Sequence, residues 1–179
     1  SALEIILRTI GVEGHEVIIP SNTYMATAIA AIKAGAKIRF LDCNVTNLQL
    51  CAEELKKKIS EKTRAVIIVH IGGFISPDLL EIKKMCAGYN VPLVEDAAHA
   101  HGAKFERRMA GSLSYAASFS FYPTKVLTTA EGGMITTNSM ELYDTARILR
   151  EHGKSDHRFN VHTEIGDNWR FSEIHAVLG

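Results

Sequence analysis

The run Ala65-Val66-Ile67-Ile68-Val69-His70 is the sequence feature that most limits what this chain can fold into. Its first five residues are apolar without a break. In a strand, successive side chains point to opposite faces, so both faces of this strand would be buried. A strand with one face in water alternates apolar and polar residues instead. The run therefore predicts a strand in a sheet that is covered on both faces.

The neighbouring segments alternate between strand and helix patterns along the chain. The chain opens on a helical pattern with Leu3, Ile6, Leu7 and Ile10 on one face. Further strands are predicted at residues 16–20, 37–42, 91–97, 115–121 and 133–137, and helices at 21–35, 51–59, 78–88, 142–152 and 172–179. This order with short connections predicts an α/β fold, with a mostly parallel mixed sheet and helices on both faces. The short glycine-rich turn before residue 133 predicts that the last strand is antiparallel.

Composition bounds the class of protein without naming a chemistry. The 179 residues suit one sizeable domain, and 46% are hydrophobic. Twenty basic residues balance twenty acidic ones, which predicts neither a nucleic-acid nor an anionic membrane partner. No apolar run approaches the ~20 residues of a membrane span. The three cysteines are odd in number and form no CxxC pair, which favours reduced thiols in a cytoplasmic protein.

In parallel α/β sheets, ligands bind beyond the carboxyl ends of the strands. Four of the predicted strand ends carry polar side chains: residues 21–24, His70, residues 96–99 and residues 120–125. The carboxyl ends of parallel strands meet at one edge, so we expect these side chains to lie together. The sequence predicts a functional site at this edge.

Lys125 follows one of these strands, two residues after Pro123, which cannot donate to a sheet ladder. No charged residue separates it from Arg108. A lysine in such a place is expected to be buried, and burial favours the neutral amine. A neutral amine is a nucleophile that can form a Schiff base with an aldehyde.

Asp96 ends a hydrophobic strand, where an unpaired charge is costly. Either it caps a helix or pairs with an arginine, or it holds a protonated ring nitrogen. His99 is expected to form a hydrogen bond beside it. His70, His99 and His101 together are a weaker candidate for a metal site, because no convincing third or fourth ligand has suitable spacing. We therefore expect no metal, and His101 is interpreted as structural.

Three further positions each have an ordinary interpretation as well as a functional one. Ser118 and Ser120 have hydroxyls suited to an anion, but alternating serine and phenylalanine also makes a good strand. Tyr24 lies early in its helix, where an aromatic ring stacks on a flat cofactor or belongs to the core. Asn168, which follows Gly166, is a turn residue by default.

Four stretches resemble one known family. VEDAAHAHGAKF and GSLSYAASFSFYPTKVLTTAEGGMITTN resemble the DegT/DnrJ/StrS family of sugar aminotransferases, which are fold-type I pyridoxal-phosphate enzymes. PSNTYMATAIAAIKAGAKIRFLD and GDNWRFSEIHAVLG resemble it as well. The resemblance covers nearly the whole chain in the right order. It implies the large domain of such an enzyme, with pyridoxal 5'-phosphate as cofactor.

The resemblance also implies a role for each candidate residue. Lys125 would bind the cofactor aldehyde as a Schiff base and later move the proton at the substrate carbon. Asp96 would pair with the pyridine nitrogen, and His99, where many relatives carry glutamine, would bind the ring hydroxyl. Tyr24 would stack on the ring and Ser120 would bind the phosphate. Asn168 would reach the phosphate of the neighbouring subunit, which implies a homodimer with shared active sites.

Two parts of the family pattern are missing from residues 1–179. The phosphate-binding turn of relatives precedes the helix that opens this chain, and the smaller C-terminal domain follows the last residue. Both ends therefore look cut, and we expect residues 1–179 to be a cofactor-binding large domain from a longer polypeptide. A dehydratase branch of the family has histidine in place of the lysine, so Lys125 argues against that branch.

The resemblance implies transfer of an amino group from glutamate or glutamine to a keto sugar nucleotide. Such a reaction belongs to the biosynthesis of cell-surface polysaccharides or secondary metabolites. Two alternatives stay open at this point. One is a non-catalytic regulatory or binding protein on the same scaffold, and the other is a metal hydrolase using His70, His99 and His101.

Overall fold

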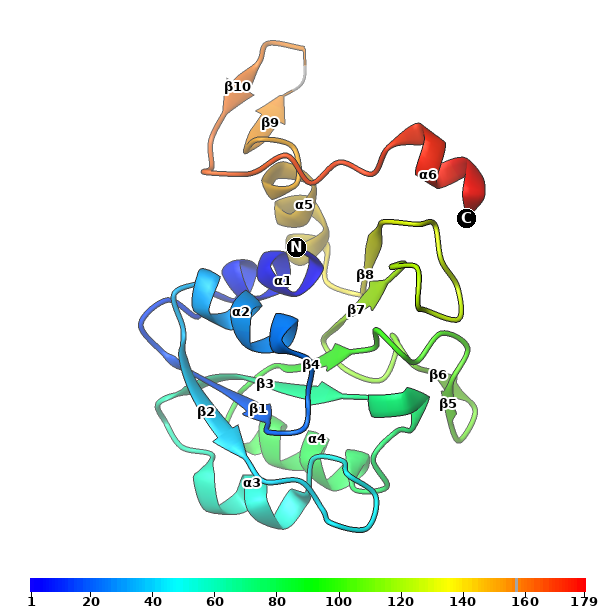
Figure 1. Cartoon of the computed structure of the whole chain (residues 1–179). Helices are drawn as coiled ribbons and strands as arrows, with labels where there is room; N and C mark the ends of the chain where they lie inside the picture. The colour runs from blue at the N-terminus through cyan, green and yellow to red at the C-terminus, as the bar shows by residue number, and fades with distance from the viewer. Residues whose placement is uncertain (157) are drawn as a thin grey trace.

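A six-stranded sheet forms the centre of the protein in a computed structural model that describes residues 1–156 and 158–179 (Figure 1). Its strand order is β2-β1-β3-β4-β7-β8. The strands are β1 (Glu16–Pro20), β2 (Lys37–Leu41), β3 (Thr63–Val69), β4 (Leu93–Asp96), β7 (Ala116–Ser120) and β8 (Gly133–Thr137). Every neighbouring pair is parallel except β7 and β8, which are antiparallel. The predicted fold class and the antiparallel last strand are both confirmed.

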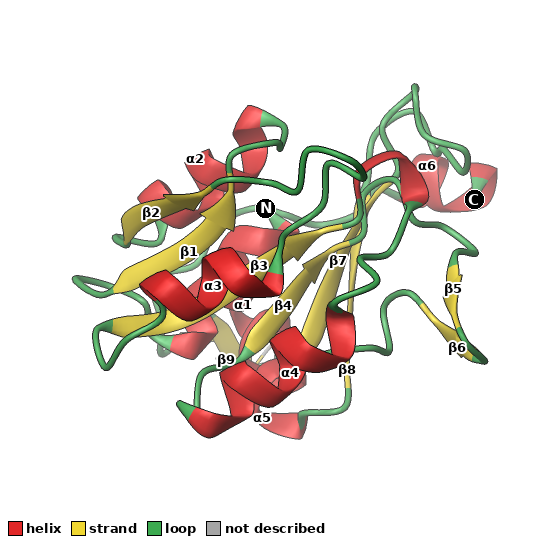
Figure 2. Cartoon of the chain, turned by 90° about the horizontal axis from the view of Figure 1, so that it is seen from below, coloured by secondary structure: helices red, strands yellow, loops and turns green. Residues whose placement is uncertain are grey.

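Helices cover both faces of the sheet. The first face carries α1 (Ala2–Ile10), α2 (Met25–Lys33) and α5 (Met140–Leu149). The second carries α3 (Ala52–Lys58) and α4 (Leu79–Gly88), which lie in front of the strands in Figure 2. A sixth helix, α6 (Glu173–Leu178), lies near the end of the chain. In the described part of the chain, no helix has the length and apolar character needed to cross a membrane.

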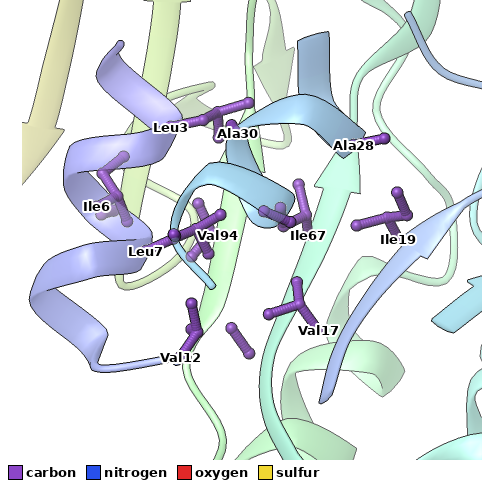
Figure 3. Packing of buried hydrophobic residues seen from close by; sticks show 14 of the residues in the cluster. Leu3, Ile6, Leu7, Val12, Val17, Ile19, Ala28, Ala30, Ile67 and Val94 are labelled. Atoms are coloured by element: carbon purple, nitrogen blue, oxygen red, sulfur yellow. The ribbon is translucent and has the colours of Figure 1, made fainter. Parts of the chain in front are cut away.

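Successive side chains of each strand point to opposite faces, so the sheet divides the core in two, as the apolar run at 65–70 predicts. Ile67 points toward α1 and α2, whereas Val66 and Ile68 pack on the α3 and α4 side. On the first side, Leu3, Ile6 and Leu7 of α1 meet Ile67 and Val94 of the sheet (Figure 3). All of these side chains are at least nine-tenths buried.

Some predicted boundaries are wrong by several residues. The helix expected from residue 21 begins at Met25, because Ser21 still donates its backbone N–H to Leu41 of the neighbouring strand. Tyr24 is consequently the residue before the helix. The helix expected at 142–152 begins earlier, at Met140, since Ser139 caps it by accepting the backbone N–H of Leu142.

Several short elements had no clear signal in the sequence. They are a 3-10 turn at Ile71–Gly73 and two small hairpins, β5 (Lys104–Phe105) with β6 (Arg108–Met109), and β9 (Lys154–Asp156) with β10 (Val161–His162). Strands of two or three residues show no periodicity that can be recognised. In Figure 1 the β9–β10 hairpin stands away from the sheet, at the far end of α5.

We expect the three free cysteines to react with a thiol reagent at two distinct rates. Burial raises the pKa of Cys86 from 9.0 to about 12, which leaves very little of the reactive thiolate. Cys43 and Cys51 are only partly buried. Titration of the folded full-length protein should therefore show these two thiols reacting before Cys86. Cys86→Ala should remove the slow phase and Cys51→Ala part of the fast phase, and rapid modification of Cys86 would contradict the core packing.

Candidate active site

A cavity of about 510 Å³ opens at the carboxyl ends of the parallel strands. Residues from or just after β1, β3, β4 and β7 contribute to its walls, together with the first residues of α1. Five of the six candidate residues of the sequence lie in this wall: Tyr24, Asp96, His99, Ser120 and Lys125. The fold therefore brings together side chains that are up to about a hundred positions apart in the chain. Their roles stay predictions.

Asp96 lies at the end of β4 and is almost fully buried. Its Oδ2 accepts a hydrogen bond from the Thr27 hydroxyl at 2.7 Å, and its Oδ1 accepts the Ala98 backbone N–H at 3.2 Å. The second bond closes the turn that follows β4, and because no helix begins there, the helix-capping alternative is wrong. No arginine pairs with Asp96 in residues 1–156 and 158–179, so that alternative is wrong. The carboxylate is instead held by two neutral donors at the cavity wall.

Thr27 is a cavity residue that the sequence interpretation missed. It lies in the first turn of α2 and is 1% exposed. Its hydroxyl also lies 2.7 Å from the hydroxyl of Thr23, four residues earlier. The available signal was the pair of threonines four residues apart after a strand end, because a helix predicted from residue 21 would place both on one face.

His99 is exposed, and its Nδ1 accepts the backbone N–H of Gly72 at 3.3 Å. An accepting ring nitrogen carries no proton, so the proton of the neutral ring lies on Nε2. His99 thus offers an N–H donor. The Gly72 contact comes from the turn after β3, which fixes the ring from a neighbouring strand end.

Lys125 is only partly buried, which corrects the expectation of a buried amine. The turn in which Lys125 donates its backbone N–H to the Tyr122 carbonyl carries the lysine out of the sheet and to the cavity wall. Ser120, the last residue of β7, accepts the Tyr122 backbone N–H at 3.3 Å. Its own hydroxyl hydrogen therefore remains available to an acceptor.

Tyr24 is 78% exposed, so it is not a core residue, and that alternative is wrong. It occupies the position before the first turn of α2, with extended backbone angles. This placement puts an aromatic ring at the wall of the cavity.

Asn168 is exposed and lies outside the cavity wall. Its backbone forms a bridge with Glu151 after α5. From α1, Arg8 donates to the Ile165 carbonyl and to Asp167, and its guanidinium lies 5.9 Å from the Trp169 ring centre. The Asn168 segment is thus attached to the helical face of the same chain.

Glu95 precedes Asp96 in β4, and its side chain points to the other face of the sheet. Its carboxylate binds several surrounding segments, a role that the sequence interpretation missed. It is fully buried, and its carboxylate accepts hydrogen bonds from His70 Nε2, from the backbone N–H groups of Gly111, Leu113 and Ser114, and from the Ser114 hydroxyl. Burial by itself raises the pKa of Glu95, but the bonds from His70, Gly111 and Ser114 outweigh burial and hold the pKa below 4.5. A buried carboxylate with this many donors is a structural anchor.

Glycine at position 111 is required by this arrangement. Its φ is +90°, and a Cβ there would lie 2.7 Å from the Phe119 ring. The residue gives its N–H to Glu95 and accepts the Thr136 hydroxyl at its carbonyl. A side chain at position 111 would push this loop away from the Glu95 carboxylate.

The three histidines considered as metal ligands do not form a cluster. His70 is bound to Glu95, and His101 packs between the rings of Phe119 and Phe121, with centroids 5.3 and 5.7 Å away. Burial lowers the pKa of His101, and the charge of Lys125 acts in the same direction. Among the residues that the structure describes, no group of three or more histidine, cysteine, aspartate or glutamate residues is placed to hold a metal ion. The described residues therefore give the metal-hydrolase alternative no support.

A doubly covered parallel sheet with an amine, a carboxylate and hydroxyls converging at its carboxyl edge defines an α/β protein with a site for a polar, charged ligand. The model of the DegT/DnrJ/EryC1/StrS aminotransferase family matches residues 1–179. The chain belongs to this family.

Individual relatives agree with the assignment. The chain is 37% identical to GDP-perosamine synthase of Caulobacter vibrioides over 180 residues, covering 100% of this chain and 48% of that protein. It is 36% identical over 179 residues to the pleiotropic regulatory protein of Geobacillus stearothermophilus, covering 99% of this chain and 47% of that protein. Among solved structures, Spr1654 from Streptococcus pneumoniae in its PLP-form matches with a TM-score of 0.89 and 28% identity, covering 99% of this chain and 51% of that one. The chain spans about half the length of the curated relatives it matches.

Replacing Glu95 by glutamine should destabilise the full-length protein by about 3 kcal/mol at pH 7, because an amide cannot satisfy all the donors around this buried position. The lowered pKa means that the stabilisation is fully present above pH 4.5 and is lost as pH falls through the folded-state pKa. Urea unfolding at several pH values measures the difference.

The control for this prediction is Glu61→Gln, at an exposed turn position, which should change stability by less than about 0.5 kcal/mol. The unfolding free energies of the parent and Glu95→Gln should approach each other below pH 4.5. A constant difference down to strongly acid pH would contradict the anchoring role.

Proposed function

We propose that the full-length protein is a pyridoxal-phosphate-dependent aminotransferase that passes an amino group to a keto sugar nucleotide. The observation that carries the proposal is the convergence of Lys125, Asp96, His99 and Ser120 on one cavity. Family membership supports the reaction class. The relatives named for GDP-perosamine synthesis support the class of substrate.

The residues of the cavity fit the cofactor in charge and in hydrogen-bonding type. Asp96 presents a buried carboxylate to a ring N–H, and His99 presents an N–H donor to a ring oxygen. Ser120 keeps a hydroxyl hydrogen for a phosphate oxygen, and Tyr24 provides a flat apolar face. When bound, pyridoxal phosphate supplies a conjugated ring that accepts electron density from the substrate carbon.

Lys125 has two tasks in this proposal. Its amine would hold the cofactor aldehyde, and the same amine would move a proton to or from the substrate carbon as acid and base. A position at the cavity wall suits both tasks, because the side chain must be reached by the substrate. Asp96 keeps the ring nitrogen protonated, since an adjacent anion favours the charged form of the ring.

The amino donor in this proposal is glutamate or glutamine, and the product enters cell-surface polysaccharide or secondary-metabolite biosynthesis. We place the enzyme in the cytoplasm, in keeping with three free cysteines. We also propose that residues 1–179 form the cofactor-binding large domain and that a smaller domain belongs to the same protein. Relatives about twice as long support this division.

The proposed assembly is a homodimer with shared active sites. Asn168 supports it, because this residue is exposed, lies outside the cavity wall of its own chain and pairs with Glu151 after α5, while Arg8 of α1 binds the neighbouring Asp167. In such a dimer, its amide would bind the cofactor phosphate of the neighbouring subunit.

A non-catalytic regulatory role is the second candidate. The similarity to a relative named as a pleiotropic regulatory protein favours it. The presence of Lys125, Asp96 and His99 in one cavity argues against it, since a regulator on this scaffold has no need of all three.

The function is tested first with Lys125→Ala in the full-length protein. The parent should develop a visible absorption band with pyridoxal phosphate and should convert glutamate to 2-oxoglutarate. Lys125→Ala should lose the band and at least about a hundredfold in rate. Lys104→Ala, an exposed lysine on β5 outside the cavity, serves as the control and should match the parent. A parent that binds no cofactor would leave the regulatory role standing.

The shared site is tested by mixing subunits of Lys125→Ala and Asn168→Ala, each with its own affinity tag. A mixed dimer has one site with both residues intact, so it should regain about half of the parent activity. Each variant alone should be impaired. Mixed dimers no more active than the average of the two variants would contradict the partner role of Asn168.

A further inference from the structure

We propose that Thr27 is a positioning residue that orients the Asp96 carboxylate toward the cofactor ring, as the middle member of a hydrogen-bonded chain from Thr23 to Asp96. This inference rests on the proposed function, in which Asp96 binds the ring nitrogen. The three residues belong to the α2 entry and to β4, and all three line the cavity.

The contacts of Thr27 are short, and the residue is almost fully buried. Its Oγ1 lies 2.7 Å from Asp96 Oδ2 and 2.7 Å from Thr23 Oγ1, with 1% of the residue exposed. Both distances are at the mode for hydroxyl hydrogen bonds. The chain of contacts leads from the partly exposed Thr23 to the buried carboxylate.

The direction of each bond follows from the chemistry of the carboxylate. An ionised carboxylate only accepts hydrogen bonds, so the single Thr27 hydrogen must point to Asp96. The contact between the two threonines must then use a lone pair of Thr27, and Thr23 is its donor. The Thr27 hydroxyl is therefore fixed in one orientation.

The two oxygens of Asp96 are held by different parts of the fold. Thr27 on α2 binds Oδ2, and the Ala98 N–H in the turn after β4 binds Oδ1. Two donors at opposite oxygens define the plane of the carboxylate. An ionised carboxylate accepts at about four lone-pair sites, so sites remain for a ring N–H.

The hydroxyl of Thr27 binds a distant residue, whereas the hydroxyl of a threonine inside a helix usually binds a carbonyl of the same helix. Thr9 on α1 returns its hydroxyl to the carbonyl of Ile5, four residues earlier, at 2.9 Å. This is the usual way for a helical threonine to satisfy its hydroxyl. The Thr27 hydroxyl instead reaches a residue 69 positions away, on the neighbouring layer of the fold. Thr9 is outside the cavity wall and serves as the matched control.

The experiment compares Thr27→Val, Thr27→Ser and Thr9→Val in the full-length protein. Valine keeps the volume of threonine and removes the hydroxyl, whereas serine keeps the hydroxyl. The measurements are the dissociation constant of pyridoxal phosphate, the thermal midpoint of the cofactor-free protein, and kcat and KM separately.

We expect Thr27→Val to weaken cofactor binding about tenfold or more, because a hydrogen bond to a charged group is lost. The loss in rate should appear in kcat rather than in KM for the sugar. Thr27→Ser should recover most of the cofactor affinity and most of kcat. Thr9→Val should leave the dissociation constant unchanged, whatever it does to the midpoint.

Cofactor affinity in Thr27→Val equal to the parent's, with the parent binding normally, would overturn the inference and leave the proposed function intact. A serine variant as weak as the valine variant would also overturn it, since the hydroxyl would then be irrelevant. A parent that binds no cofactor would remove both the function and the inference. If valine prevents folding, Thr27→Ala replaces it, with the same expected loss.

Discussion

The buried Glu95 carboxylate is the interaction on which the carboxyl edge of this sheet depends. It ties the residue after β3, through His70, to the loop that leads into β7, through Gly111, Leu113 and Ser114. A charge at a fully buried position is tolerated only when such donors replace water. Because they do, the ends of β3 and β4 and the start of β7 keep fixed relative positions. Strand alternation then turns the next residue, Asp96, to the opposite face and into the cavity.

The cavity is an outcome of topology rather than of any single motif. Tyr24 and Thr27 enter from the segment after β1, His99 from the turn after β4, and Lys125 from the turn after β7. Parallel strands place all of these turns at one edge, with helices sealing both faces. Tyr24 is exposed and Lys125 is only partly buried, so the cavity is open to solvent at these two residues. Asn168 lies outside the cavity wall and pairs with Glu151 after α5, next to Asp167, which Arg8 of α1 binds.

Much of the fold and part of the site were predictable. The run at 65–70 is apolar on both faces, which suits only a doubly covered strand, and the strands around it follow from their own patterns. Asp96 and Ser120 lie at the ends of predicted strands and His99 and Lys125 follow within four residues, so the rule for parallel sheets predicts that all four lie at one edge. Helix starts were predicted less accurately than strands. Ser21 was expected to begin a helix, but its backbone N–H donates to the Leu41 carbonyl of the neighbouring strand instead.

The sheet, its layers, the family and the edge where the polar residues gather all follow from local periodicity and from residues close in the chain, so the amino-acid order alone predicts them. The donors that hold each carboxylate could be found only from the packed fold. Thr27 and Asp96 are 69 positions apart, and Glu95 meets residues 16 to 25 positions away on both sides. Two adjacent acidic residues look alike in sequence. Strand alternation sends Glu95 to a structural anchor and Asp96 to the cavity, and the partners that separate their roles arrive only when distant segments pack together.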